Sequence, residues 1–521
     1  MPAVAISALP MFPFSEKRTA EIWLSYLEQS LLVLLVLSAG SLLWLSLRWP
    51  MVGDAGIYHL IAVQTFLGAV PYRDVADINM PLIYEIHRII ATVGGLGDGA
   101  FRVFDVSAAL AIGVLTAVFT RPAGVIRCAV AGGAVILMHL AFGPHDAGQR
   151  DFLLLALVLL NVMCSVEAIR RPRLQNVLLT AAGMAAGAGV LLKPTAAAFV
   201  LLPFVALGQV RIREAVSVIS GFLAIIAGAV IVLYRADALG ACFHVLREYL
   251  PVYSAFDRKP ALQLAMKAAL WALRLCGFVI PGLLTLRLPL GARERTALGI
   301  ALCGVLHVLV QGKGYFYHMH PLILGMIVWG TLCLPQLSFR PAFVSVALIA
   351  LSVAITGARG LQRAYTYTAS ARAIQSAQSS MEQALARYFP PGSRVEMFDA
   401  EAGGTLAMAR SWLRMSTPDL YWMFTPPTRW GPENSLLAAL RNSPPDGLVI
   451  TKDRHGFAPA ENWREHDLIA ERYTLVASRD VFQGLLTRGT GGRPRNGACT
   501  SGNRRFSGRF RAFDRNRQPK Q

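Results

Sequence analysis

Residues 31–47 read LLVLLVLSAGSLLWLSL and contain no charged side chain. A helix rises about 1.5 Å per residue, so roughly 20 residues cross the hydrocarbon core of a bilayer. This run is longer than the apolar core of a typical signal peptide, and no small-x-small cleavage site follows it. It therefore predicts a retained membrane anchor.

Apolar runs of similar length recur along the chain, which has 521 residues, 54% of them hydrophobic and 16% charged. Soluble proteins are less apolar and carry more charge. We predict a polytopic all-α membrane protein with about eleven transmembrane helices. The predicted spans lie near residues 28–48, 100–120, 126–142, 151–169, 175–192, 194–209, 214–234, 264–286, 296–311, 320–335 and 341–358.

Two of these assignments leave alternatives open. The fifth and sixth spans could form one broken element, because glycines and Pro194 interrupt them. In the eighth, Lys267 and Arg274 would be functional cations in mid-span. Alternatively, residues 261–274 form an amphipathic helix along the membrane surface, and the span starts later.

The formal net charge of +19 does not indicate a nucleic-acid groove, because the basic residues sit in short loops and in the terminal tail. Alternate loops are basic, and the positive-inside rule places them and the amino terminus in the cytoplasm. These basic residues are Lys17, Arg18, Arg121, Arg127, Arg170, Arg171, Arg173, Arg211, Arg213, Arg287, Arg293, Arg295 and Arg340. The opposite side then receives residues 49–99, 143–150, Lys193, 235–263, 311–319 and everything after about 359.

Three regions are predicted from these patterns. Residues 1–358 form the transmembrane domain. Residues 359–487 alternate strand-length and helical segments, which predicts a small α/β domain outside the cytoplasm. Residues 488–521 form a basic, disordered tail. The seven cysteines are scattered and suggest neither a disulfide framework nor a zinc site.

Acidic residues gather in the first outer segment. Asp54 follows the first span and opens an amphipathic helix that would place its carboxylate at the membrane surface. Asp74 and Asp77 lie near the turn that follows. The alternative is that such acids are solvated loop residues or helix caps.

Basic residues also occur in the loops predicted to lie outside, where the positive-inside rule does not expect them. Arg150 lies in GPHDAGQRDF, Lys193 in LLKPTAAAF and Lys313 in QGKGYFYHMHP. An anionic lipid phosphate would account for them, since Lys and Arg bind phosphate by charge-assisted hydrogen bonds. His318 and His320 could bind a metal or belong to an interfacial aromatic belt. Neither a P-loop nor a hydrolase motif is present, so ATP-driven transport is not expected.

The blocks GDAGIYHLIAVQTFLGAVPYRD, NMPLIYEIHRIIATVGGLGDGAFRVFD, GQRDFLL, LLKPTAAAF and QGKGYFYHMHP cover residues 20–330 in scattered form. With them the chain resembles the GT-C membrane glycosyltransferases, especially the bacterial family related to lipid A aminoarabinose transferase and protein O-mannosyltransferases. The resemblance implies a donor sugar on a polyprenyl phosphate and makes Asp54 the catalytic carboxylate. Relatives commonly carry a second acid after the first, which is missing here, and Asp74 or Asp77 could substitute for it.

The expected chemistry is sugar transfer with inversion, to an envelope glycan, lipid or protein acceptor at the bacterial inner membrane. Asp54 would take the proton of the acceptor hydroxyl, and Lys193, Arg150 and Lys313 would hold the leaving phosphate. The residues expected to line the sugar site are Tyr58, His59, Asp74, Asp77 and His318. No cofactor is required by this scheme, no metal ligand is assigned, and a divalent metal stays open.

A transporter or flippase for a lipid-linked saccharide is the alternative. Transporters tend to show repeated halves and polar residues that meet near the bilayer midplane. No convincing repeat is found here, and the polar clusters lie at one face.

Overall fold

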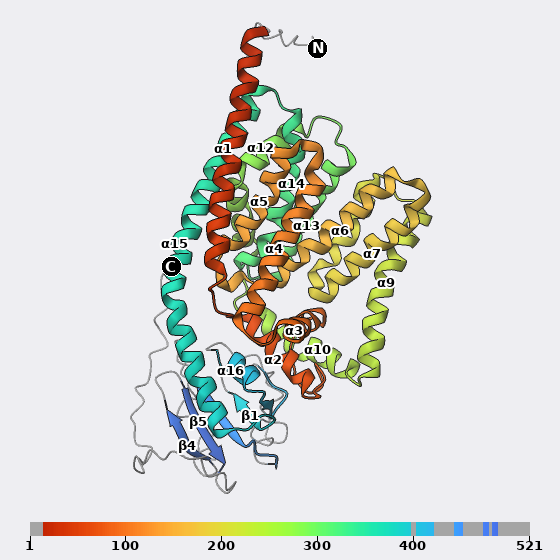
Figure 1. Ribbon diagram of the computed structural model, residues 1–521. Helices are drawn as coiled ribbons and strands as arrows, with labels where there is room; N and C mark the ends of the chain where they lie inside the picture. The colour runs from red at the N-terminus through yellow and green to blue at the C-terminus, as the bar shows by residue number, and fades with distance from the viewer. Residues whose placement is uncertain (1–13, 398–402, 421–441, 452–472, 479–481, 488–521) are drawn as a thin grey trace. The chain divides into compact units, whose positions relative to one another are not determined.

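The computed structural model describes residues 14–397, 403–420, 442–451, 473–478 and 482–487. The chain is mostly helical, as predicted. It divides into two compact units (Figure 1). The first comprises residues 1–49, 101–229 and 257–368, and the second comprises residues 50–100, 230–256 and 369–521.

Long apolar helices build the first unit. Eight helices of the described chain are long and apolar enough to cross a membrane, or nine if one bent pair counts as a single span. Two shorter apolar helices, α5 and the η4–α8 pair, account for the remaining predicted spans. The helices are α1 (Phe14–Ser46), α4 (Asp98–Thr120), α5 (Val125–Ala141), α6 (Arg150–Arg170), α7 (Gln175–Leu192), η4 (Pro194–Leu201), α8 (Leu202–Leu207), α9 (Ile212–Arg235), α11 (Ala261–Arg274), α12 (Cys276–Thr285), α13 (Ala292–Gln311), α14 (His320–Cys333) and the first part of α15 (Phe339–Tyr388). Short 3-10 turns join them: η1 (Arg121–Ala123), η2 (Pro144–Asp146), η3 (Pro172–Leu174), η5 (Phe316–Met319) and η6 (Leu334–Gln336).

Helix α14 is the core of this unit, because all of its residues are buried. Its ribbon lies among those of α5, α12 and α13 (Figure 1). Glycines let neighbouring helices approach it closely. A Cβ on Gly330 would lie 1.8 Å from the carbonyl oxygen of Phe278 on α12, and one on Gly325 would lie 2.3 Å from the amide nitrogen of Ala301 on α13. Small residues at crossings are typical of helices packed in lipid.

The peripheral helices expose apolar side chains, as helices that face lipid do. In the most apolar stretch of α9, only 17% of the residues are buried, and Leu223 and Ile219 are exposed. Helices α1 and α15 lie side by side, with Gly357 against Ser38 and Gly360 against Leu42. The chain is therefore a multi-pass membrane protein.

The structure answers both open questions about the spans. Lys193 has an extended backbone that separates α7 from η4, and η4 packs back against α7, with Ala196 near Gly189. The fifth and sixth predicted spans are thus two elements. Helices α11 and α12 meet at a bend of 92°. Lys267 and Arg274 consequently lie on a separate helix before the bend, which agrees with the interfacial alternative.

The second unit combines helices with a mixed sheet. Its helices are α2 (Asp54–Phe66), α3 (Leu82–Gly94), α10 (Leu239–Ala255), α16 (Gly404–Arg410) and the end of α15. Its strands are β1 (Arg394–Met397), β2 (Arg414–Met415), β3 (Gly447–Thr451), β4 (Tyr473–Ser478) and β5 (Phe482–Thr487). The order is β2-β1-β3-β5-β4, with β2, β1 and β3 parallel and β3, β5 and β4 antiparallel.

Hydrogen bonds join the three stretches of the second unit. Gln64 on α2 donates to the carbonyl of Leu413 at 2.8 Å and accepts from the amide of Met415 at 3.0 Å. The Tyr249 hydroxyl on α10 donates to Asp419 at 2.5 Å. The two long loops between spans therefore fold together with the carboxyl-terminal region, an association that the sequence did not predict.

The helix α15 runs without a break through residue 359, where the small domain was predicted to start. The three-region division remains a prediction of domain organisation. Residues 488–521, the predicted disordered tail, lie outside the described residues.

Candidate active site

Asp54 is the first residue of α2 and is half-buried. The preceding Gly53 has φ +62°, a left-handed conformation that glycine adopts without steric cost, and it turns the chain into the helix. The positive end of a helix dipole favours a carboxylate at this position. The helix thus fixes Asp54 in place as an ionisable group at the start of the segment that follows the first span.

Tyr58 and His59 lie one turn further along α2 and are buried. Both pack against His87 of α3, whose Nδ1 lies 3.2 Å from Nδ1 of His59 and whose ring centroid is 5.4 Å from that of Tyr58. Burial, followed by the nearby charge of Arg410, lowers the pKa of His59 to about 4. At neutral pH His59 is therefore an uncharged imidazole inside this unit.

Asp74 and Asp77 make local hydrogen bonds. Asp74 accepts from the amide of Val70 at 2.8 Å and pairs with Arg73 at 2.9 Å. Buried Asp77 accepts from Asn79 at 2.9 Å and from the Tyr84 hydroxyl at 2.8 Å. Both carboxylates stabilise the turn between α2 and α3, so their geometry matches the alternative interpretation of these acids as loop and cap residues.

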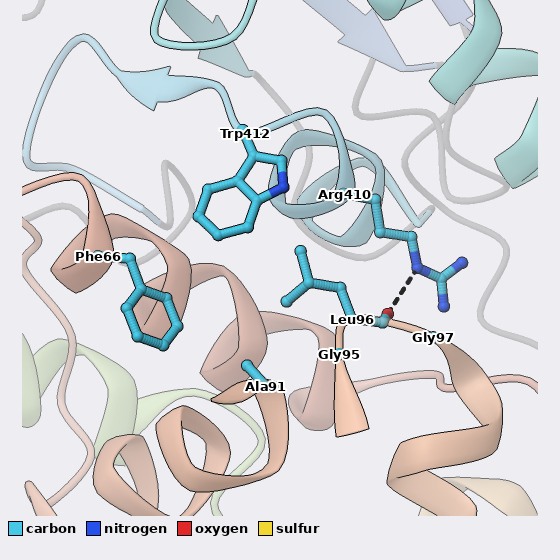
Figure 2. A pocket seen from close by; sticks show the side chains of 7 residues that line it. All are labelled: Phe66, Ala91, Gly95, Leu96, Gly97, Arg410 and Trp412. Atoms are coloured by element: carbon cyan, nitrogen blue, oxygen red, sulfur yellow. Dashed lines mark hydrogen bonds between the residues drawn. The ribbon is translucent and has the colours of Figure 1, made fainter. Parts of the chain in front are cut away.

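A pocket of about 400 Å³ opens in the second unit (Figure 2). The rings of Phe66 and Trp412, with centroids 6.1 Å apart, form part of its wall. Arg410 lies at the opposite side and donates to the carbonyl of Leu96 at 3.0 Å, while it pairs with Asp98 at 2.8 Å. Its other lining residues are Ala91, Gly95, Leu96 and Gly97. The pocket combines an aromatic surface with backbone polar groups.

In the first unit, Asp151 is the centre of a buried polar cluster. Its Oδ2 lies 2.5 Å from Nζ of Lys193, and its Oδ1 lies 2.6 Å from Nε2 of His307. Gln311 donates to the same Oδ1 at 3.2 Å. The carboxylate thereby fixes Lys193 between α7 and η4, because a buried cation is stable only with a partner of this kind.

Further cations surround residues 311–320. The chain turns at Lys313, between Gly312 with φ +75° and Gly314 with φ +63°. The Gly314 carbonyl accepts from Nζ of Lys267 at 3.1 Å, and Lys193 lies over the Tyr317 ring. The backbone amide of Lys259 donates to the carbonyl of Gly312, and the side chain of Arg258 packs against Gly312. Arg150 is close enough to His318 for its charge to affect this histidine.

We call this group the cation cluster; it contains Arg150, Lys193, Arg258, Lys259, Lys267 and Lys313. The carboxylates among them in the described chain are Asp151 and Asp257. Positive charge is therefore in excess, which is the electrostatic requirement for holding an anion. The structure thus brings together Arg150, Lys193, Lys313 and His318, which the sequence placed in three separate loops.

His318 and His320 have different partners. His318 lies beside Tyr317, with ring centroids 4.7 Å apart, and near Lys193. Nε2 of His320 lies 2.6 Å from Asp146. The H-x-H pair therefore does not form one two-histidine metal site.

The arrangement of helices is similar to that of solved structures. A crystal structure of ArnT from Cupriavidus metallidurans bound to undecaprenyl phosphate superposes with a TM-score of 0.60 at 13% identity, covering 89% of this chain and 99% of that one. The apo structure of ArnT superposes with a TM-score of 0.58 at 14% identity, covering 89% and 98%. The chain has a GT-C-like fold. No protein-family model and no curated protein matches the sequence.

The GT-C-like fold confirms the fold expected from the sequence blocks. Asp151, His307 and Gln311 have no role predicted from the sequence, although Asp151 lies within the block GQRDFLL. His307 and Gln311 lie in an apolar span four residues apart, hence on one helical face. Two polar side chains on one face of an apolar span were the feature of the sequence that could have indicated a buried polar cluster. The catalytic and binding roles assigned to Asp54 and the cations remain predictions.

Proposed function

We propose that this protein is an inverting glycosyltransferase that moves a sugar from a polyprenyl-phosphate donor to an acceptor hydroxyl. The cation cluster is the observation that carries the proposal. A lipid phosphate is a stable anion when it leaves the sugar, so cations that bind it can replace a protonating acid. ArnT, with a similar fold, has been crystallised with undecaprenyl phosphate.

In this proposal Lys193, Arg150 and Lys313 bind the donor phosphate. Asp151 positions Lys193 through the 2.5 Å ion pair, so the ammonium group is held ready before the donor arrives. A preorganised charge stabilises a developing anion without having to move during the reaction.

Asp54 is the proposed general base. Its carboxylate would accept the proton of the acceptor hydroxyl as the oxygen attacks the anomeric carbon, and the bond from that carbon to the phosphate oxygen would break. A single displacement inverts the configuration at that carbon. A carboxylate at the start of a well-packed helix is held in a constant orientation, which general base catalysis needs.

The extracytoplasmic location of the reaction also belongs to the proposal. Residues 50–100, 230–256 and 369–521 form one compact unit, and the segments predicted from loop charge to lie outside are nearly the same. The described residues of this unit contain no complete candidate span, so these segments share a side. The loops around Arg150, Lys193 and Lys313, likewise predicted outside, meet in the cation cluster. Both findings support the predicted grouping of these segments on one side of the membrane. That this side is extracytoplasmic, in an inner-membrane protein with a cytoplasmic amino terminus, is part of the proposal.

The pocket beside Trp412 is a candidate binding site for part of the acceptor. Its volume of about 400 Å³ would accommodate a sugar ring, and an indole ring offers an apolar face for stacking. An envelope glycan, a glycolipid or a glycosylated protein would each present such a ring.

The test uses purified full-length protein in nanodiscs with a panel of radiolabelled polyprenyl-phosphate sugars and membrane-extract acceptors. Asp54→Asn should reduce transfer by about 10²- to 10⁴-fold, the range typical of general base catalysis. Glu85→Gln, which removes an exposed carboxylate of the same unit, should retain activity.

Undiminished transfer by the Asp54→Asn protein would reject Asp54 as the base. Movement of the lipid-linked sugar across the membrane without transfer would instead indicate a flippase. A binding assay with the unmodified polyprenyl phosphate tests the cation cluster separately, because phosphate binding is expected for a transferase and for a flippase.

A further inference from the structure

Three side chains from different elements meet in a second buried cluster of the first unit. His139 lies at the end of α5, Asp146 at the end of the short turn η2 (Pro144–Asp146), and His320 at the start of α14. Each is at most 3% exposed. One nitrogen of each histidine and one carboxylate oxygen all lie within 4.8 Å of one another.

Asp105 fixes the orientation of His139. Its Oδ1 lies 3.0 Å from Nε2 of His139 and also accepts from the amide of Gly148 at 2.8 Å. A carboxylate accepts the proton of Nε2, so Nδ1 presents a lone pair on the other side of the ring. A histidine that binds a metal through one nitrogen commonly donates its other N–H to a carboxylate in this way.

Nδ1 of His139 is buried, and its contact with Asp146 lacks the geometry of a hydrogen bond. It points toward Oδ2 of Asp146, 3.3 Å away, and that same oxygen lies 2.6 Å from Nε2 of His320. A lone pair facing a carboxylate oxygen is repulsive. A cation between the two atoms would remove this repulsion.

The surroundings reinforce the need for a cation. Phe152 stacks on His139, with ring centroids 3.7 Å apart, and Phe142 lies edge-on to His320. These rings give the cluster apolar neighbours. Arg102, 3.6 Å from Asp105, is one positive charge against the two carboxylates of Asp105 and Asp146. Buried charge of this kind is costly unless it is balanced.

We propose that His139, Asp146 and His320 bind a divalent transition metal such as Zn²⁺. Zinc lies about 2.0–2.1 Å from nitrogen and oxygen ligands in a tetrahedron, which places ligand atoms about 3.3 Å apart. The His139 and Asp146 atoms already have this separation, and the His320 and Asp146 atoms would move about 0.7 Å apart. Three protein ligands leave the fourth position for a water molecule.

The metal would fasten the loop between α5 and α6 to α14. This loop continues directly into Arg150 and Asp151, so the metal site would hold the base of the cation cluster in place. The inference does not depend on the proposed function, because a metal can clip this loop whatever the protein transports or transfers.

The test measures bound metal by mass spectrometry in tag-free, full-length protein purified in detergent. About one zinc per chain is expected for the native protein, with loss of metal in His139→Gln, Asp146→Asn and His320→Gln. His145→Gln is the matched control, since this exposed histidine is the neighbour of Asp146 in the same loop. Loss of metal in the control as well would contradict the proposal.

A second measurement covers the case in which a variant does not fold. Chelator should lower the thermal midpoint of the native protein, and Co²⁺ added to the stripped protein should produce the visible absorption of a tetrahedral site. A native protein that purifies without metal, is insensitive to chelator and takes up no Co²⁺ would overturn the proposal. The cluster would then hold a proton on His139 between the two carboxylates.

Discussion

The buried ion pair between Asp151 and Lys193 allows a quantitative test. At 2.5 Å and an effective dielectric constant near 20, the Coulomb attraction is about 7 kcal/mol, much of it offset by desolvation. Replacing Asp151 by Asn removes the charge and keeps the shape, so Lys193 loses its carboxylate while it stays buried. We expect Asp151→Asn to destabilise the protein by about 3–5 kcal/mol.

Lys193→Met should cost less, because His307 and Gln311 still donate to the carboxylate of Asp151. The double variant leaves neither charge in the core. We therefore expect it to be more stable than the sum of the single effects predicts, by about 2 kcal/mol or more.

Thermal unfolding in detergent, followed by tryptophan fluorescence, measures these effects as shifts of the midpoint. Asp257→Asn is the matched control, because Asp257 and Lys259 are also 2.5 Å apart but are about one-third exposed. An exposed pair is worth about 0–1 kcal/mol. Equal shifts for Asp151→Asn and Asp257→Asn, or strictly additive effects in the double variant, would refute the reasoning.

Three further predictions concern other parts of the protein. Burial raises the pKa of Glu396 to about 8, so the folded state keeps a proton that the unfolded state releases near pH 4.5. The free energy of unfolding should therefore fall as the pH rises from about 4.5 to 8, by roughly 5 kcal/mol at most. Glu396→Gln should abolish this pH dependence in thermal unfolding measured at several pH values. Gly330→Ala should destabilise by about 3 kcal/mol or more because α12 and α14 must separate, whereas Gly228→Ala, with open space around it, should be neutral in the same assay. Trp412→Ala should raise the KM for the acceptor without changing donor binding, and unchanged acceptor kinetics would exclude the pocket as an acceptor site.

The sequence by itself determined where the apolar helices lie, and it predicted the orientation of the chain. Apolar runs are a local property, and a run such as residues 31–47 has few alternatives to a membrane helix. Each predicted span falls on helical elements, although the eighth covers two helices that meet at a bend of 92°. The loop charges likewise distinguished the segments that carry the candidate residues from the basic loops between the other spans. The positive-inside rule depends on loop composition alone, so the sequence is enough to apply it.

Only the tertiary structure decided which polar residues meet. Asp151 and Lys193 are 42 positions apart, and His320 and Asp146 are 174 apart, so no local pattern relates them. The sequence joined His318 and His320 because they are neighbours in it, but the turn into α14 directs them to different clusters. Buried polar groups require partners, and the packing of helices selects those partners from distant parts of the chain. Hydrophobic periodicity therefore reveals where the helices are, while their crossings decide what chemistry they can hold.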